Sequence, residues 1–439
     1  MKILRMGSRG PSVELLQLAL VRAGYGPLDT DGLFGPLTEA ALRRFQSAMG
    51  LTADGIAGRE THRALLPWYT GYRIHRIVPG DTFWQLAQRY GSTVDAIRLA
   101  NPGARENDLR PGETLVIPLG FDVVPTTIRW SSALVGYCVR GLQARYPFLT
   151  AGEIGRSVLG RPIWRLRLGE GEKRVLCNAS HHANEWICTP LLLKFCEQLS
   201  AAFAASDSIA GVSAAELLEC AAIHLVPAVN PDGIDLVTGE LDGGESFRQA
   251  ERIAAAYPRF PFPEGWKANI RGTDLNLQYP AGWEHAKAIK YAQGIVSPAP
   301  ADFVGRAPLS APESRALYDY TLALSPCLTL SYHTQGRVIY WRYGAMEPPR
   351  GREIGEKLAE VSGYALEDAP YVSGFAGYKD WFIACFDRPG YTVEAGQGTN
   401  PLPLTDFDEI YRENLPVLVQ AALLQVSDRG PYSSSKAPV

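Results

Sequence analysis

The chain has 439 residues, enough for about three domains at roughly 150 residues each, and its 46% hydrophobic and 20% charged residues are ordinary for a globular protein. The net charge is −3 and no dense block of lysine and arginine occurs, so no nucleic-acid partner is expected. No run of about 18 consecutive apolar residues occurs either, so no membrane span is expected.

The N-terminal segment and the cysteines bear on where the protein is made. The sequence MKILRMGSRGPS is basic but lacks the apolar core and the small-residue cleavage site of a secretory signal. Seven cysteines are scattered through apolar surroundings without paired spacing, which favours buried free thiols, although one disulfide could form among them. We therefore expect no signal peptide and synthesis in a reducing compartment.

Residues 1–68 contain an internal repeat. The stretches DGLFGPLT (31–38) and DGIAGRET (54–61) share the pattern D-G-x-x-G-x-x-T at a spacing of 23 residues. Each Asp-Gly is typical of a turn, and Thr38 and Thr61 are expected to cap a following helix. Apolar residues at helical spacing predict helices over residues 12–24 and 39–50, so this segment is expected to be a small all-α bundle.

The whole of residues 1–68, including LRMGSRGPSVELLQLAL and the two Asp-Gly turns, resembles the peptidoglycan-binding domain of bacterial wall hydrolases. The resemblance implies binding to peptidoglycan. The alternative for this segment is a helical spacer without a ligand.

Residues 72–119 are expected to fold as strand, helix, helix, strand. The runs are YRIHRIV, FWQLAQRYG, TVDAIRLAN and ETLVIP, with a turn at Pro79–Gly80 and Thr82 as a helix N-cap. The pattern resembles a LysM domain, which implies binding to glycans that contain N-acetylglucosamine. Two adjacent modules for one polymer would bind with avidity. The alternative is a small βααβ domain without a ligand.

Residues 125–427 alternate between strand-like and helical runs, which predicts an α/β domain with a mostly parallel or mixed sheet. The apolar runs RVLCNAS, AIHLVPAVN, CLTLSYH and YTVEAG are typical of strands buried on both faces. Helices are expected over CTPLLLKFCEQLSAAFAAS and APESRALYDYTLALS. Residues 428–439 are polar and rich in proline and serine, so a disordered tail is expected.

The stretch SHHANEW (180–186) indicates a metal site. It follows a predicted strand and precedes a helix, and open α/β sheets bind ligands at the carboxyl ends of their strands. His182 and Glu185 have the H-x-x-E spacing, whereas His181 does not, and Zn²⁺ commonly takes two histidines and one glutamate. His333 ends another predicted strand and is the favoured third ligand; His285 remains a chemical alternative.

Five motifs then identify the third segment as similar to the zinc carboxypeptidase family: HANEW, VPAVNPDG, GTDLN, SYHTQG and YTVEAGQGTNPLP. Four more, WKANIRGTDLN, HTQGRVIYW, GYKDWF and PLTDFDEIY, resemble its bacterial γ-D-glutamyl-diaminopimelate peptidase branch. The resemblance implies an α/β domain with a mixed central sheet and one Zn²⁺ per chain. It implies that His182, Glu185 and His333 are the zinc ligands.

The same resemblance implies further site residues. Glu394 matches the catalytic carboxylate that takes a proton from the attacking water and passes it to the leaving amine. The cation that stabilises the oxyanion is expected to be Lys267, with Arg271 as the alternative. Asn276 is expected to contact substrate. Tyr371 is expected at the position of a mobile tyrosine that covers the substrate, and Tyr378 competes for this role.

One position departs from the family pattern. Many relatives have an arginine after Asn276 that binds the free C-terminal carboxylate of the substrate, and this chain has Leu277 there. Losing a bidentate carboxylate ligand disfavours ordinary carboxypeptidase action.

The sequence therefore predicts a zinc peptidase that cleaves the γ-D-glutamyl bond to diaminopimelate or lysine in peptidoglycan stem peptides. The alternatives are a zinc carboxypeptidase of other specificity and a wall-binding protein with an inactive peptidase domain. Because the expected substrate lies in the wall while no export signal is seen, a cytoplasmic or spore-associated protein acting on wall or cortex is expected.

Overall fold

The computed structural model describes residues 2–424, so the predicted tail at 428–439 lies outside the described residues. The chain forms two compact units that divide between Thr150 and Ala151, and each is described by itself. All seven cysteines are free, and five of them are buried, as the sequence predicts.

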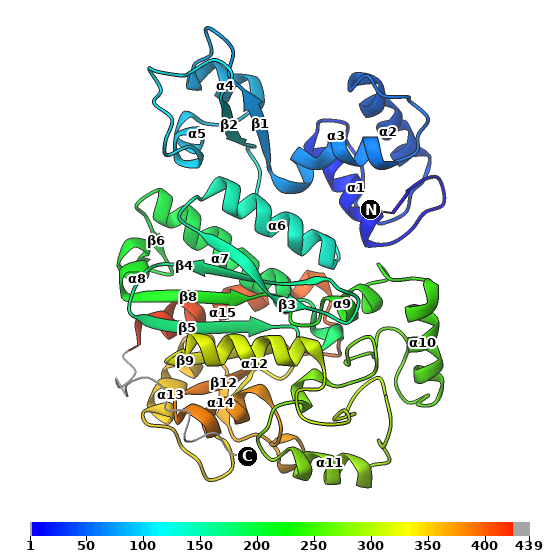
Figure 1. The fold of residues 1–439 in the computed structure, drawn as a ribbon, viewed down its shortest axis with the longest axis vertical. Coiled ribbons are helices and arrows are strands. Elements are labelled where there is room, and N and C mark those ends of the chain that lie inside the picture. The colour runs from blue at the N-terminus through cyan, green and yellow to red at the C-terminus, as the bar shows by residue number, and fades with distance from the viewer. Residues whose placement is uncertain (1, 425–439) are drawn as a thin grey trace. The chain divides into compact units, whose positions relative to one another are not determined.

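The first unit begins with three helices and continues with a two-stranded sheet (Figure 1). The helices are α1 (Pro11–Arg22), α2 (Pro36–Ala48) and α3 (Arg59–Thr70). The next elements are β1 (Tyr72–Arg76), α4 (Phe83–Tyr90), α5 (Val94–Ala100) and β2 (Thr114–Pro118), with β1 and β2 antiparallel. Helix α6 (Ser132–Arg145) completes the unit. The predicted helical bundle and βααβ module are both confirmed.

The two helix caps predicted in the internal repeat are wrong. Helices α2 and α3 are preceded by Gly35 and Gly58, which provide no side-chain cap, and the two threonines lie inside the first turn. Thr38 and Thr61 instead accept hydrogen bonds from glutamines of the preceding helices, as described in the Discussion. The cap at Thr82 is confirmed, because its side chain accepts the backbone N–H of Gln85.

The second unit is built on an eight-stranded mixed sheet of order β11-β10-β12-β9-β5-β8-β4-β3 (Figure 1). The strands are β3 (Thr150–Arg156), β4 (Pro162–Leu168), β5 (Lys173–Ala179), β8 (Ala221–Val226), β9 (Leu328–His333), β10 (Val338–Tyr340), β11 (Ala365–Glu367) and β12 (Gly390–Glu394). The central strands β12, β9, β5 and β8 are mutually parallel, whereas β10 and β4 pair antiparallel with β12 and β8. The predicted α/β domain with a mixed sheet is confirmed.

Helices cover the sheet and connect its strands. They are α7 (Cys188–Ala204), α8 (Ala214–Cys220), α9 (Pro231–Val237), α10 (Gly244–Ala255), α11 (Trp283–Ala292), α12 (Pro312–Leu324), α13 (Gly351–Ser362), α14 (Tyr378–Phe386) and α15 (Phe407–Leu423). Helices α7 and α15 contact β5, and α14 contacts β9 and β12. A short hairpin, β6 (Ser208–Ile209) with β7 (Val212–Ser213), follows α7. Because helices cover it, every residue of β8 and β9 is buried.

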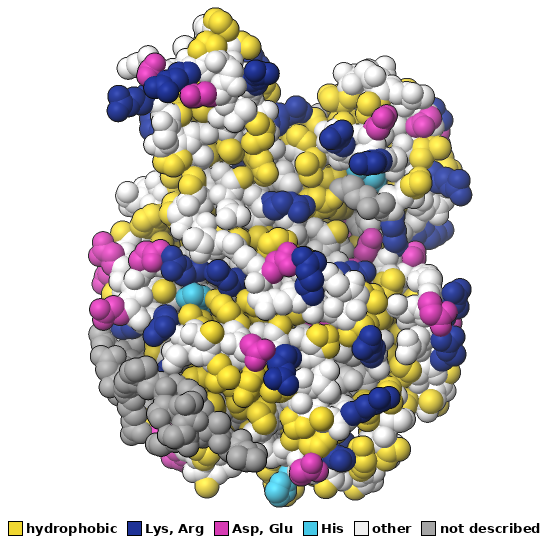
Figure 2. Space-filling model, viewed as in Figure 1, with side chains coloured by type: hydrophobic (Ala, Val, Ile, Leu, Met, Phe, Trp, Pro, Cys, Tyr) yellow, Lys and Arg dark blue, Asp and Glu magenta, His cyan; other side chains and the backbone are white. Residues whose placement is uncertain are grey.

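Two surface properties bear on the predicted partners. On the face drawn in Figure 2, basic and acidic side chains are interspersed, in keeping with the net charge of −3. Residues 183–204, which include α7, are long and apolar enough to cross a membrane by length and composition, but 67% of the apolar window is buried inside the fold. No other helix within residues 2–424 meets this criterion. Residues 183–204 are therefore best explained as a core helix.

Candidate metal centre

Three neighbouring parallel strands carry the site at their carboxyl ends. β5 ends at Ala179, and the chain then turns through Ser180, whose φ is +57°, to bring His182 to a short 3₁₀ turn, Ala183–Glu185. β9 ends at His333 and β12 at Glu394, and these two residues are register partners. Parallel strand ends meet at one edge of a sheet, which brings together residues far apart in the sequence.

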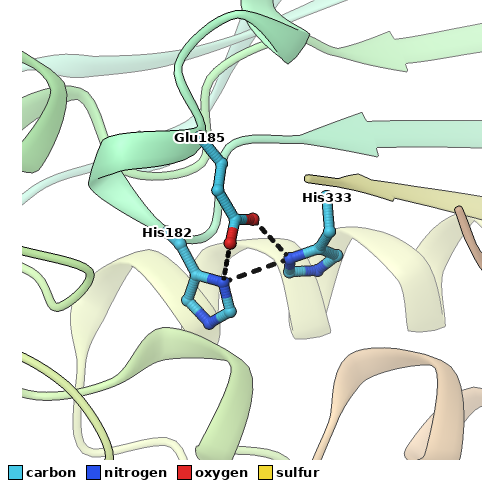
Figure 3. Close-up of side chains that lie close together, drawn as sticks. All are labelled: His182, Glu185 and His333. Atoms are coloured by element: carbon cyan, nitrogen blue, oxygen red, sulfur yellow. Dashed lines mark hydrogen bonds and ion pairs between the residues drawn. The ribbon is translucent and has the colours of Figure 1, made fainter. Parts of the chain in front are cut away.

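The three predicted ligands converge there (Figure 3). Glu185 Oε1 lies 2.9 Å from His182 Nδ1, and its Oε2 lies 2.8 Å from His333 Nδ1. The two histidine Nδ1 atoms are 3.2 Å apart, and the donor atoms of all three residues lie within 4.8 Å of one another. Two imidazole nitrogens and one carboxylate directed at a common point fit Zn²⁺, with a coordination position left for water.

Asp274 orients His182, and sequence reasoning missed it. Its Oδ1 lies 3.3 Å from His182 Nε2, so Nε2–H donates to the carboxylate and Nδ1 keeps its lone pair for a metal. The backbone N–H groups of Asn276 and Asp302 donate to the two Asp274 oxygens at 3.1 Å each. The motif GTDLN did single out this stretch, but it gave no sign that Asp274 faces a histidine 92 residues away.

The other histidines do not join the site. His181 is fully buried, and its Nε2 lies 3.0 Å from Tyr279 Oη. Burial and the neighbouring His333 and His182 hold the pKa of His181 well below its usual value, so its ring is neutral. His285, the alternative left open above, is exposed and stacks on Phe375.

Opposite charges stabilise one another in the site. Burial alone would raise the pKa of Glu185, but His182 and His333 hold it well below its usual range. Burial likewise opposes the charged form of His182, and Glu185 and Asp274 nevertheless raise its pKa.

Glu394 lies on the rim of the same site. It lines a cavity of about 450 Å³ that also contains His182 and Glu185. Burial, helped by the charge of Glu185, raises the pKa of Glu394 to about 7. A carboxyl group with this pKa can both accept and return a proton near neutral pH.

The two candidate cations differ in position. Lys267 lines the cavity, and its Nζ lies 3.6 Å from Glu185 Oε1. Burial would lower the pKa of Lys267, but Glu185, Asp274 and Glu394 raise it, so the ammonium is charged at neutral pH. Arg271 is exposed and is not among the residues that line the cavity.

The predicted substrate-binding residues also differ in whether they line the cavity. Asn276 lines the cavity, and its Oδ1 accepts the backbone N–H of Tyr378 at 3.0 Å. Tyr371 has 71% of its surface exposed and is not in the cavity lining. Its competitor Tyr378 is fully buried, with its hydroxyl 2.9 Å from Thr321 Oγ1. Leu277 is 8% exposed and lines the cavity. It stands at the sequence position where many relatives have the arginine that binds the C-terminal carboxylate of the substrate.

The chain can be compared with known proteins at this point. Residues 137–414 match the zinc carboxypeptidase family, residues 9–65 the putative peptidoglycan binding domain and residues 75–118 the LysM domain. The chain is 43% identical over 286 residues to Gamma-D-glutamyl-L-diamino acid endopeptidase 1 of Lysinibacillus sphaericus, covering 65% of this chain and 70% of that protein.

Two further similarities are more limited. Over 65 residues, 15% of this chain and 25% of the other, it is 38% identical to the Spore cortex-lytic enzyme of Bacillus cereus. The fold resembles that of bovine thrombin-activatable fibrinolysis inhibitor, with a TM-score of 0.53 at 17% identity, covering 67% of this chain and 96% of that one. At this identity the likeness concerns the fold alone.

Proposed function

Because the chain belongs to the zinc carboxypeptidase family, we propose that it hydrolyses peptidoglycan stem peptides at the bond between γ-D-glutamate and diaminopimelate or lysine. The observation that carries this proposal is the 43% identity to a γ-D-glutamyl-L-diamino acid endopeptidase, which extends over 286 residues. The convergence of His182, Glu185 and His333 on one point supports a metal-dependent reaction.

In this proposal His182, Glu185 and His333 hold one zinc ion per chain. A zinc ion bound there would polarise the scissile carbonyl and lower the pKa of a bound water molecule to near 7. Asp274 fixes the tautomer of His182 by accepting its Nε2–H, which keeps Nδ1 directed at the ion.

In this proposal Glu394 transfers the proton of the attacking water. Its carboxylate accepts a proton from the attacking water and then donates it to the amine of the leaving diamino acid. Lys267 is the cation that stabilises negative charge on the carbonyl oxygen, because it reaches the cavity and Arg271 does not. Asn276 contacts the substrate, and Tyr371, which lies between the cavity-lining residues Ala369 and Ser373, covers it.

The second candidate function is that of a zinc carboxypeptidase with another specificity. It needs a ligand for the free terminal carboxylate, and Leu277 cannot supply one. Among residues 2–424, the cavity lining contains three lysines, Lys267, Lys290 and Lys379, and no arginine. The alternative of an inactive wall-binding protein is disfavoured, because the three metal-ligand residues and Glu394 are all present.

The two N-terminal domains suggest where the enzyme acts. A peptidoglycan-binding domain and a LysM domain precede the peptidase domain, and both are expected to hold the chain on wall glycan. The similarity to a spore cortex-lytic enzyme supports a spore-associated protein that acts on cortex or wall peptidoglycan.

The test is incubation of the purified protein with L-Ala-γ-D-Glu-meso-diaminopimelate and its D-Ala-extended forms, with and without a chelator. Mass spectrometry of the products should show L-Ala-D-Glu, and the chelator should abolish its release. Release of only the C-terminal D-Ala from the extended forms would favour the carboxypeptidase alternative. No cleavage by a protein that retains zinc would favour the wall-binding alternative.

A further inference from the structure

One loop, residues 266–276, carries several of the site residues described above. Lys267 and Asn276 line the cavity, and Asp274 accepts a hydrogen bond from His182. Residues 267–274 form no helix or strand, so the shape of this part of the loop depends on individual hydrogen bonds. The residues that make those bonds therefore decide where the site residues point.

Asn269 closes a turn in the middle of this loop. Its backbone N–H donates to the carbonyl of Thr273 at 2.8 Å, and the N–H of Gly272 donates to the carbonyl of Asn269 at 2.9 Å. The side-chain Oδ1 of Asn269 accepts the backbone N–H groups of Arg271 and Thr273 at 3.1 Å each. Because Oδ1 is the acceptor in these bonds, Nδ2 is the atom that faces Glu313, 3.2 Å from its Oε2.

Glu313 lies in the first turn of α12 and is completely buried. Its Oε2 accepts from Asn269 Nδ2, and its Oε1 accepts the backbone N–H of Val158 at 3.0 Å. Only an ionised carboxylate has two oxygens that both act as pure acceptors. Burial raises the pKa of Glu313 to about 7, and the N–H groups of Val158 and Asn269 oppose this rise, so the side chain is largely ionised at pH 8.

The turn that carries Val158 is itself held in place by Asp232 of α9. Asp232 is completely buried, and its Oδ1 accepts the hydroxyl of Ser157 at 2.8 Å and Nη1–H of Arg161 at 2.7 Å. Its Oδ2 accepts the backbone N–H of Leu159 at 2.8 Å. One end of the connection to the loop is thus bonded to a turn with three fixed points.

We propose that Glu313 is a positioning residue of the active site, which acts through Asn269 to hold the loop so that Lys267 faces the scissile carbonyl and Asp274 faces His182. Glu313 itself is not among the residues that line the cavity. The part of this inference that concerns Lys267 rests on the proposed function, whereas the part that concerns Asp274 can be tested by zinc binding alone.

The position of Asn269 in the loop explains why one bond affects two site residues. Lys267 comes shortly before it and Asp274 shortly after it. Each of these two residues also has a backbone bond of its own: the carbonyl of Lys267 accepts the N–H of Ala183 at 2.9 Å, and the N–H of Asp274 donates to the carbonyl of Phe303 at 2.8 Å. Loss of the bond to Asn269 should therefore shift the loop without unfolding it, and small shifts of catalytic groups are costly.

The experiment exchanges the two partners of this hydrogen bond. Glu313→Gln replaces one acceptor oxygen with an NH₂ group, so one of the two N–H donors at Glu313 then faces another donor. Asn269→Asp replaces the donor amide with a carboxylate, whose charge opposes that of Glu313. The double variant Glu313→Gln/Asn269→Asp restores one donor and one acceptor with reversed polarity, and it keeps one buried negative charge.

Two quantities are measured on the full-length protein at pH 8. The Kd for zinc, from competition with a chromophoric chelator, reports on Asp274 and His182. The kcat and KM for L-Ala-γ-D-Glu-meso-diaminopimelate report on Lys267, whose charge acts mainly on the carbonyl oxygen of the transition state. Each single variant should raise the Kd and lower kcat by about 3- to 10-fold, the effect of one lost hydrogen bond, with little change in KM. The double variant should return both quantities to within about twofold of wild type.

The matched control is Glu14→Gln. Glu14 belongs to the first compact unit, is 5% exposed, and also accepts N–H groups through both oxygens, from the backbone nitrogen and Nε of Arg129. Glu14→Gln should therefore cost a comparable hydrogen bond while leaving the Kd for zinc and kcat unchanged. Circular dichroism establishes which variants are folded.

Two results from folded variants would overturn the inference while leaving the proposed function intact: an unchanged Kd and kcat in the single variants, or a double variant no better than the single ones. If Glu313→Gln alone fails to fold, Asn269→Asp and the double variant still decide. If both single variants fail to fold, the hydrogen bond is a requirement of folding and the positioning role is wrong. No cleavage of the tripeptide by wild type would contradict the proposed function itself, and the Kd for zinc would still decide the role of Glu313 towards Asp274.

Discussion

Glu394 is the residue on which the proposed proton transfers depend. It shares a cavity with His182 and Glu185 but is not one of the three grouped donor residues. Glu394→Gln keeps the shape of the side chain and removes its basicity. We expect kcat to fall about 10²- to 10⁴-fold, the usual contribution of a general base, while bound zinc stays at one per chain.

The measurement is the rate of L-Ala-D-Glu release together with zinc content by atomic emission. Glu409→Gln is a suitable control, because Glu409 is an exposed carboxylate of α15 outside the cavity. Loss of zinc from Glu394→Gln would instead make Glu394 a ligand and contradict its assignment as the base.

Asp274 should influence metal affinity without touching the metal. It accepts the Nε2–H of His182, and Asp274→Asn would offer an amide that can present a donor to that atom instead. Loss of such a partner typically weakens metal binding by 10- to 100-fold. Competition with a chromophoric chelator should give this increase in Kd, and an unchanged Kd would show that His182 is oriented by other contacts.

The success of the sequence reasoning differs from residue to residue for a physical reason. His182 and Glu185 could be predicted because H-x-x-E is a local spacing. Asp274 could not be predicted, because its contact with His182 forms only when the folded sheet brings the two residues together. Tyr371 was expected over the substrate; Ala369 and Ser373 of its loop line the cavity, whereas Tyr371 itself is exposed and does not.

At the scale of elements, the internal repeat forms two equivalent turns, residues 31–38 and 54–61, each fixed by hydrogen bonds to a glutamine of the preceding helix. We call them the locked turns. Gln17 Nε2 donates to Asp31, Leu33 and Thr38, and Gly32 N–H donates back to Gln17. The second copy has the same hydrogen bonds: Gln46 Nε2 donates to Asp54, Ile56 and Thr61, and Gly55 N–H donates to Gln46. The two threonines were predicted as caps because the glutamines, 21 and 15 residues earlier, could not be connected to them from the sequence.

The sheet also contains elements that could not be predicted from the sequence. The strands predicted as apolar runs became β5, β8, β9 and β12, which lie in the middle of the sheet. The outer strands were not predicted individually: β3 is half exposed and contains two glycines, and β10 and β11 have three residues each. Short or half-exposed strands carry a weak periodic signal, so their pairing is decided by the rest of the sheet.

The locked turns predict how the first unit responds to substitution. Gln46 is 1% exposed, and Gln46→Ala removes its hydrogen bonds with Gly55 N–H, Asp54 and Thr61. The loss of buried hydrogen bonds should destabilise the first unit by about 1–3 kcal/mol. Hydrogen exchange of peptides from residues 1–70 measures this, with the exposed Ser47→Ala of the same helix as control.

The same turns predict a dependence on pH. The backbone N–H of Ile56 and then Gln46 lower the pKa of Asp54, and Leu33 and Gln17 do the same for Asp31. A carboxyl group whose pKa is lower in the folded state adds stability that is complete above its unfolded pKa of about 4 and is lost as pH falls below it. Protection of residues 1–70 should therefore decrease below about pH 4, and less steeply in Gln46→Ala. Equal steepness would show that other carboxylates dominate.

At the scale of the whole molecule, a peptidoglycan-binding domain, a LysM domain and one peptidase domain share a chain, so binding and cleavage can be separated experimentally. Binding to wall raises the local concentration of stem peptides around the peptidase domain, and this advantage does not exist for a soluble tripeptide. Soluble N-acetylglucosamine oligomers should therefore inhibit cleavage of purified insoluble wall and leave cleavage of L-Ala-γ-D-Glu-meso-diaminopimelate unchanged.

Glucose oligomers of the same length provide the control, since they lack the acetamido group. The expected result is slower release of L-Ala-D-Glu from wall, with the enzyme recovered in the supernatant after centrifugation. If the oligomers release the enzyme but the rate on wall is unchanged, the two domains locate the enzyme without raising its rate. If the oligomers inhibit the tripeptide as well, glycan binds at the peptidase cavity itself, and the separation of binding from cleavage is wrong.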